Sequence, residues 1–233
     1  MENNHTLRVA IVDYQMCNLF SVMHTCIHVG LDARITSDST FILESDGVIL
    51  PGVGAFGNAI KNLKRLDLVN PIKDFIDTGK PFMGICLGMQ LLMSESEEFG
   101  NFRGLDIISG MVVRLTKESD KLEHVRVPQV GWNNIYRPQN RDKNLWNGTP
   151  LENIKNGEYM YFVHSYYPVP NNDEIILSVS NYAGIEFCSS FSMKNLFAFQ
   201  FHPEKSAHEG IKIYKNWASI IKHYKESRNN HGR

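Results

Sequence analysis

The sequence predicts a single-domain α/β protein with a largely parallel central sheet, flanking helices and added antiparallel strands. The first half alternates short apolar runs with helical stretches, the rhythm of parallel strands joined by crossover helices. The second half contains mostly strand-like runs between turn residues, which is typical of antiparallel or mixed pairing. With 233 residues, 42% of them hydrophobic, the chain can bury one sizeable core.

The predicted elements of the first half follow from the periodicity of apolar residues and from the residues that end helices. Its predicted strands are short apolar runs over residues 7–12, 47–50 and 82–85. Its predicted helices cover residues 18–29, 56–66 and 71–78. Gly79 and Pro81 end the third helix before the strand that follows. We therefore expect helices on both faces of the sheet.

The second half adds five predicted strands and one helix. The strands cover residues 107–115, 159–163, 175–179, 185–191 and 196–201. A final amphipathic helix is predicted over about residues 210–224, where apolar residues such as Ile213 and Trp217 recur at helical spacing. We expect one domain over residues 1–225 and a polar, disordered tail over residues 226–233.

Composition excludes several classes of function. The 24 Lys and Arg residues against 25 Asp and Glu leave a formal net charge of -1, so nucleic acid or an anionic membrane would not be attracted. No apolar run or leader pattern predicts a membrane segment, and we expect a cytoplasmic enzyme. The cysteines are scattered and predict no disulfide framework and no metal site, and we expect no cofactor.

The most informative segment is a Gly-x-Cys-x-Gly motif centred on Cys86, where a predicted strand runs into a helix. This pattern is typical of a nucleophile elbow, with Gly84 and Gly88 giving room for a tight turn. A helix N-terminus favours the thiolate, and the amide of Leu87 would face a developing oxyanion. The alternative is an inert, buried thiol.

A second motif supplies a general base and its orienting carboxylate. His202 ends a predicted strand, and Glu204 follows two residues later, with Pro203 between them. His202 can take the proton of the thiol and later protonate leaving ammonia, while Glu204 holds the imidazole. Nine histidines leave room for coincidence, and His164 is a competing base without such a carboxylate.

A third motif, Pro51-Gly52-Val53-Gly54, follows an apolar strand and precedes a helix. Its backbone therefore lies at the carboxyl edge of the sheet, where its amides could complete an oxyanion hole. The alternative is a phosphate-binding loop, but the third glycine of a dinucleotide fingerprint is missing, because Gly57 comes too early.

With these motifs in order, the chain resembles the class I (triad) glutamine amidotransferases over nearly its whole length. The Pro-Gly-Val-Gly loop, Val130-Gly131-Trp132-Asn133 and the segment around His202 are similar to the histidine-biosynthesis subfamily, the glutaminase subunits of imidazole glycerol phosphate synthase. The resemblance implies L-glutamine as substrate and a Cys86–His202–Glu204 triad. It also implies an oxyanion hole from the amides of Val53 and Leu87. The glutamine-binding residues that it implies are Gln90, Glu98, Ser165 and Tyr166.

The same resemblance implies a partner, a (β/α)8-barrel cyclase subunit that forms a heterodimer with the chain and receives ammonia through a channel. Asn18, Trp132 and Lys205 match family positions at that interface. For Trp132 the alternative is core packing, although the polar residues after it suggest an exposed turn.

The chain departs from the family pattern in three loops. Gln15 and Cys17 replace the usual glycines of the first loop, Gln129 replaces a histidine, and Ala183 replaces a glycine. If the first-loop positions require a positive φ, strain of about 1 kcal/mol each follows. These changes keep open a paralogue that supplies ammonia to sugar-modifying enzymes in surface polysaccharide synthesis. A γ-glutamyl hydrolase or peptidase on the same fold, and a non-catalytic binding subunit, are further alternatives.

Overall fold

The computed structural model describes residues 6–16, 19–115 and 126–231. Its centre is a seven-stranded sheet in the order β11-β12-β13-β4-β3-β1-β2. The strands are β1 (Arg8–Val12), β2 (Asp32–Thr36), β3 (Gly47–Leu50), β4 (Phe82–Ile85), β11 (Ile176–Tyr182), β12 (Ile185–Met193) and β13 (Leu196–Phe199). The run from β13 to β2 is parallel, whereas β11, β12 and β13 pair antiparallel. The predicted parallel sheet with added antiparallel strands is therefore confirmed.

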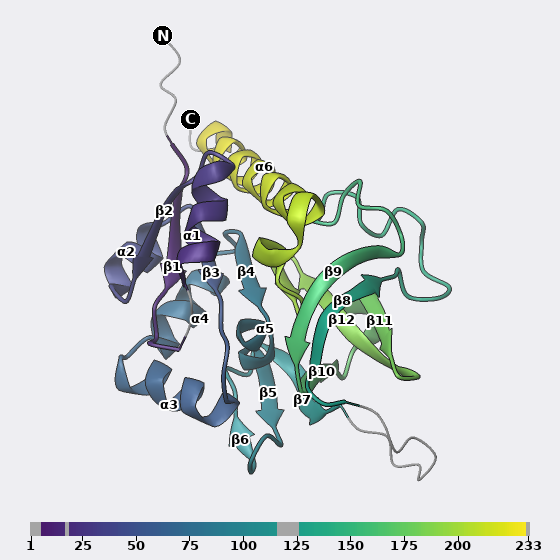
Figure 1. Ribbon diagram of the computed structural model, residues 1–233. Coiled ribbons are helices and arrows are strands. Elements are labelled where there is room, and N and C mark those ends of the chain that lie inside the picture. The colour runs from purple at the N-terminus through teal and green to yellow at the C-terminus, as the bar shows by residue number, and fades with distance from the viewer. Residues whose placement is uncertain (1–5, 17–18, 116–125, 232–233) are drawn as a thin grey trace.

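Two smaller sheets flank the carboxyl ends of the parallel strands (Figure 1). One has the order β10-β7-β5-β6 and consists of β5 (Met93–Ser96), β6 (Phe102–Arg103), β7 (Ile108–Arg114) and β10 (Tyr166–Pro170). The other is an antiparallel ribbon of β8 (Gln129–Ile135) and β9 (Glu158–His164). The ribbon and β10 follow one another along the chain, so they bring a second wall to the sheet edge.

Helices cover both faces of the central sheet, as the sequence predicts. The first face carries α1 (Leu19–His28) and α6 (Ala207–His231), which lie next to each other in Figure 1. The second face carries α2 (Ser39–Glu44), α3 (Phe56–Arg65), α4 (Val69–Asp77) and the short α5 (Leu87–Leu91). Successive side chains of β1 point to opposite faces of the sheet, so this strand contributes to the core on each face. Val9 and Ile11 pack in the first core, and Ala10 and Val12 pack in the second.

The structure differs from the sequence prediction mainly in short elements. The sequence patterns do not predict β2, α2, β5, β6, β8 or β10, most of which have four to seven residues and weak apolar patterns. The strand expected to reach residue 201 ends at Phe199. The final helix runs from Ala207 to His231, so residues 226–231, expected to be disordered, lie in it. None of the helices within the described residues is long and apolar enough to cross a membrane.

Candidate active site

Cys86 occupies the turn between β4 and α5, as the elbow motif predicts. Its backbone has a φ of 52°, an unusual value for a residue with a side chain, and its amide donates to the carbonyl of Phe199 at 2.7 Å. The glycine requirement is strongest at Gly88, where a Cβ atom would lie 1.7 Å from the carbonyl oxygen of Leu50. At Gly84 a Cβ would meet the backbone of Met89 at 3.2 Å, which is tight rather than prohibitive. The turn therefore holds Cys86 at the sheet edge.

His202 and Glu204 form a buried pair behind Cys86. The Nδ1 atom of His202 lies 2.7 Å from Oε1 of Glu204, and their side chains are only 3% and 5% exposed. The backbone is fixed as well, because the amide of His202 donates to the Tyr161 carbonyl and Ser206 Oγ donates to the His202 carbonyl. This geometry leaves Nε2 as the nitrogen available to the thiol.

The charge state of His202 follows from its neighbours. Burial lowers the pKa of His202, but the negative charge of Cys86, its hydrogen-bonding interaction and Glu204 together raise this pKa from 6.5 to about 10. Nε2 makes no hydrogen bond of good geometry with any described residue, and catalytic contacts are often loose before substrate binds. The electrostatics therefore favour the protonated imidazolium form of His202.

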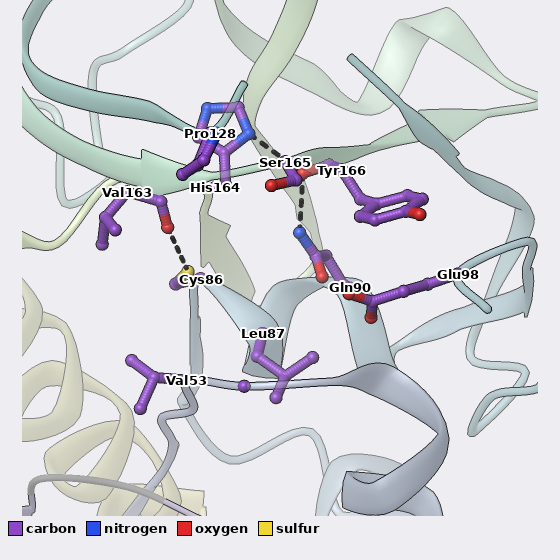
Figure 2. Close-up of a pocket in the computed structure, with 11 residues that line it drawn as sticks. Val53, Cys86, Leu87, Gln90, Glu98, Pro128, Val163, His164, Ser165 and Tyr166 are labelled. Atoms are coloured by element: carbon purple, nitrogen blue, oxygen red, sulfur yellow. Dashed lines mark hydrogen bonds between the residues drawn. The ribbon is translucent and has the colours of Figure 1, made fainter. Parts of the chain in front are cut away.

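A pocket of about 220 Å³ opens in front of Cys86. Figure 2 shows that its floor comes from the elbow and the loop after β3, and its opposite wall from the end of β9 and the start of β10. The lining residues are Val53, Gly54, Cys86, Leu87, Gln90, Glu98, Pro128, Val163, His164, Ser165 and Tyr166. All four residues predicted to surround glutamine belong to this lining. His202 and Glu204 do not line it.

The predicted glutamine-binding side chains are anchored in distinct ways. Gln90 is 5% exposed, and its Nε2 donates to the carbonyl of Tyr166 at 2.8 Å. Glu98 accepts from the backbone amide of Phe56 through Oε2 at 2.6 Å. Burial raises the pKa of Glu98, and the Phe56 amide opposes that rise. Both groups are therefore held at the pocket wall before any ligand enters.

The loop predicted to complete the oxyanion hole lies in a conformation in which its Gly52 carbonyl occupies the other predicted donor, the amide of Leu87. Val53 lines the pocket, but the amide of Leu87 donates to the carbonyl of Gly52 at 3.3 Å. The hydroxyl of Tyr14 donates to the preceding carbonyl, that of Pro51, at 2.7 Å. A Cβ on Gly52 would lie 2.1 Å from that hydroxyl, so the loop packs closely on the first loop of the chain.

The competing histidine, His164, has a different environment. Its Nδ1 lies 2.9 Å from the carbonyl oxygen of Tyr166. Because a carbonyl can only accept, Nδ1 carries the proton and donates it to this bond. Burial lowers the pKa of His164 to about 4, with the charge of His202 acting in the same direction and the hydrogen bond opposing it. It lines the pocket as a neutral ring opposite Gln129 in the β8–β9 ribbon. Among the residues that the structure describes, no carboxylate makes a hydrogen bond or ion pair with His164, which favours His202 as the base.

Two of the three predicted interface residues come together around Tyr161. The ring of Trp132 is 53% exposed and meets the Tyr161 ring edge-on at 6.0 Å, and Lys205 Nζ lies 5.9 Å from the centre of the same ring. The exposure of Trp132 contradicts core packing. The third residue, Asn18, lies outside the described residues. In the first loop, Gln15 has a φ of 65°, so a left-handed conformation is present at this replaced glycine.

Gln200 is a residue that sequence reasoning missed. It is fully buried, its Oε1 accepts from Gln90 Nε2 at 3.0 Å, and its Nε2 donates to Cys86 Sγ at 3.6 Å. Its position immediately beyond a strand and two residues before His202 is a signal that could have singled it out. Within the described residues no cluster of histidine, cysteine and carboxylate side chains could hold a metal ion.

Comparison with known proteins places these features in context. The family described as "Glutamine amidotransferase class-I" matches residues 10–219. The protein named imidazole glycerol phosphate synthase subunit HisH from Caldanaerobacter subterraneus subsp. tengcongensis is 45% identical over 215 residues, which cover 92% of this chain and 98% of that protein. The protein of the same name from Moorella thermoacetica is 42% identical over 215 residues, covering 92% and 96%.

Solved structures agree on the fold. A structure of PurLQS from Thermotoga maritima matches with a TM-score of 0.67 at 20% identity, covering 94% of this chain and 99% of the matched chain. A crystal structure of a glutamine amidotransferase matches with a TM-score of 0.65 at 14% identity, covering 92% and 98%. At these identities the likeness concerns the fold alone.

Proposed function

The chain belongs to the class I glutamine amidotransferase family, and on that premise we propose that it is the glutaminase subunit of an imidazole glycerol phosphate synthase. It hydrolyses L-glutamine at Cys86 and passes ammonia to a cyclase subunit in histidine biosynthesis. The observation that carries the chemistry is the pocket headed by Cys86, with the buried His202–Glu204 pair behind it. The high identity to proteins of that name over more than nine tenths of the chain supports the acceptor pathway.

The first half of the reaction forms a thioester. The Sγ thiolate of Cys86 attacks the side-chain carbonyl carbon of glutamine, and the carbonyl electron pair moves onto oxygen. Backbone amides of Val53 and Leu87 stabilise that oxyanion. The Leu87 amide is bound to the Gly52 carbonyl in the resting structure, so the loop must turn this carbonyl away before the hole is complete. His202 then donates its Nε2 proton to the amide nitrogen, and ammonia leaves.

The second half regenerates the thiolate. His202, now neutral, takes a proton from water as the water attacks the thioester carbonyl. Collapse of the second tetrahedral intermediate expels Cys86 Sγ and releases glutamate. Glu204 holds Nδ1 at 2.7 Å throughout, which fixes the tautomer and stabilises the imidazolium that starts the cycle and forms again when water attacks. A nucleophile, a base and its orienting group thus account for hydrolysis without a cofactor.

The substrate is held by the groups that line the pocket away from Cys86. The carboxylate of Glu98 fits the α-ammonium group of glutamine, and Gln90 and the Ser165–Tyr166 segment bind the remaining polar atoms. Burial raises the pKa of Glu98, and an ammonium group beside the carboxylate would lower that pKa again. This pairing favours free glutamine over a glutamyl peptide whose amino group is blocked.

The partner surface is the side of the molecule where Trp132, Tyr161 and Lys205 meet. Tryptophan and tyrosine are residue types enriched at protein interfaces, and here an exposed Trp132 contacts Tyr161. The ribbon that carries Trp132 also carries Val163, whose carbonyl lies 3.7 Å from Cys86 Sγ. A (β/α)8-barrel cyclase that docks here as a heterodimer would receive ammonia close to where it forms. Because the pathway's phosphorylated intermediates stay inside the cell, we infer a cytoplasmic location.

The decisive experiment measures glutamine hydrolysis by the purified chain with and without the organism's own cyclase subunit. We expect strong stimulation by the cyclase and no activity in Cys86→Ala. A glutamine-directed electrophile should label Cys86 and leave Cys26 and Cys188 unmodified, because burial raises the pKa of both of those thiols well above its usual range. Stimulated turnover that survives Cys86→Ala would refute the proposed nucleophile.

The second candidate is a paralogue that supplies ammonia to a sugar-modifying synthase. The left-handed Gln15 in the first loop favours it, because this loop packs against the oxyanion loop and departs from the family's glycine pattern. Stimulation of glutamine turnover by a sugar-modifying synthase, with none by the cyclase, would select this candidate.

A further inference from the structure

We propose that Gln200 is a positioning residue that links substrate binding to the nucleophile, by donating a hydrogen bond to the Cys86 thiolate while fixing the amide of Gln90. This inference deepens the proposed glutaminase function and rests on it. Gln200 lies just beyond β13, and its backbone amide donates to the Ser189 carbonyl at 2.9 Å, which continues the pairing of β12 with β13. The side chain is therefore delivered from a rigid strand end.

The orientation of the Gln200 amide follows from its neighbours. Gln90 donates from Nε2 to the Tyr166 carbonyl at 2.8 Å, and a carbonyl can only accept, so that atom of Gln90 must be nitrogen. The same nitrogen lies 3.0 Å from Gln200, which must therefore present its oxygen there. Its NH₂ group then points at Cys86 Sγ, at 3.6 Å. The donor on the sulfur is thus dictated by a chain of contacts.

The role of this donor changes when Cys86 loses its proton. As a thiol, Cys86 can donate to the Val163 carbonyl, which lies 3.7 Å from Sγ. As a thiolate it has no hydrogen left for that carbonyl, and the sulfur needs donors instead. Gln200 Nε2 supplies one of them, from a fully buried position where such a bond is little weakened by water. Gln200 therefore favours the reactive form of the nucleophile.

The other end of the Gln200 side chain acts on substrate binding. Both Nε2 hydrogens of Gln90 are engaged, by Tyr166 and Gln200, whereas its Oε1 accepts no hydrogen bond from a described residue and remains an acceptor in the pocket wall. An acceptor at that position discriminates for a substrate that presents N–H groups. Removal of Gln200 would free Gln90 to rotate, so one buried side chain influences both binding and reactivity.

The test compares three variants by the pH dependence of Cys86 alkylation with iodoacetamide and by glutamine turnover in the complex with the cyclase. Gln200→Met keeps the shape and removes both hydrogen bonds. We expect alkylation at neutral pH to slow about tenfold, with kcat reduced by at least a similar factor and KM raised. Gln200→Glu keeps an acceptor for Gln90 but places a carboxylate beside the sulfur, so alkylation should slow further than in Gln200→Met.

Gln90→Met is the third variant and should mainly raise KM, with a smaller change in alkylation than in Gln200→Met. Asn216→Leu is the matched control, because Asn216 Nδ2 also donates to two carbonyls, those of Pro150 and Glu152, far from Cys86. We expect it to alter thermal stability and to leave the alkylation profile unchanged.

Alkylation within twofold of wild type in both Gln200 variants would overturn the inference, as would an equal change in Asn216→Leu. Alkylation requires only the chain itself, so it tests Gln200 even if the cyclase fails to stimulate turnover. A wild-type chain whose Cys86 is alkylated normally but which never hydrolyses glutamine would instead count against the proposed function.

Discussion

Replacing Glu204 by Gln removes one negative charge behind His202 while the shape of the pair is kept. The Oε1–Nδ1 distance is 2.7 Å and both side chains are buried. At an effective dielectric constant of about 20, the attraction at this distance is on the order of 6 kcal/mol. Because the oxygen of the neutral amide still accepts a hydrogen bond from Nδ1–H, only part of this attraction is lost. We expect the transition-state stabilisation to fall by about 3–5 kcal/mol. This corresponds to a fall in kcat of roughly 10²- to 10⁴-fold.

The assay is steady-state glutamine hydrolysis in the complex with the cyclase, together with the pH profile of Cys86 alkylation. Glu209→Gln is the matched control, because Glu209 Oε1 lies 3.1 Å from Nδ1 of the neighbouring His208, which is 84% exposed. An exposed pair contributes little, so this variant should behave as wild type. The reasoning is refuted if Glu204→Gln keeps kcat within threefold, or if both variants fall equally.

Three further predictions concern stability. The pKa of His164 in the folded state is lowered from 6.5 to about 4, so its neutral ring contributes stability above pH 6.5. About 2–3 kcal/mol of that stability is lost as the pH falls towards 4. The free energies of urea unfolding of wild type and His164→Gln should therefore converge over that range. Gly88→Ala would place a methyl group 1.7 Å from the Leu50 carbonyl oxygen. It should lower the free energy of unfolding by about 3 kcal/mol or more and impair the alkylation of Cys86. Ala183→Gly, at a turn residue with a φ of 51°, should raise the urea midpoint by the equivalent of about 0.5–1 kcal/mol; a lower midpoint would contradict the strain argument.

The sequence is most predictive where short motifs determine local geometry. The elbow at Cys86 and the adjacent His202 and Glu204 could be identified because each lies at a strand end, and parallel strands bring their carboxyl ends to one edge. The predicted glutamine-binding residues also meet in one pocket, but their identification depended on the family resemblance. Their catalytic and binding roles remain predictions.

Other features depend on contacts between distant parts of the chain. The link from Gln90 to Gln200 joins residues 110 positions apart, and no local pattern indicates it. The ribbon of β8 and β9 escaped full prediction because Gly131, Asn133 and Asn134 weaken the strand pattern, while cross-strand pairing with residues 158–164 provides the stabilisation. The extension of α6 to His231 was likewise not predicted, because the polar tail lies beyond the apolar stripe of the helix.

On the proposed function, the hydrogen bond from the Leu87 amide to the Gly52 carbonyl bears on the relative amounts of the glutaminase and cyclase subunits in the cell. A chain that rests with this amide occupied loses little glutamine to idle turnover when it is made in excess over its partner. Nitrogen supply would then follow the number of assembled complexes and not the number of free chains. Overexpression of this chain alone should therefore leave the intracellular ratio of glutamine to glutamate nearly unchanged.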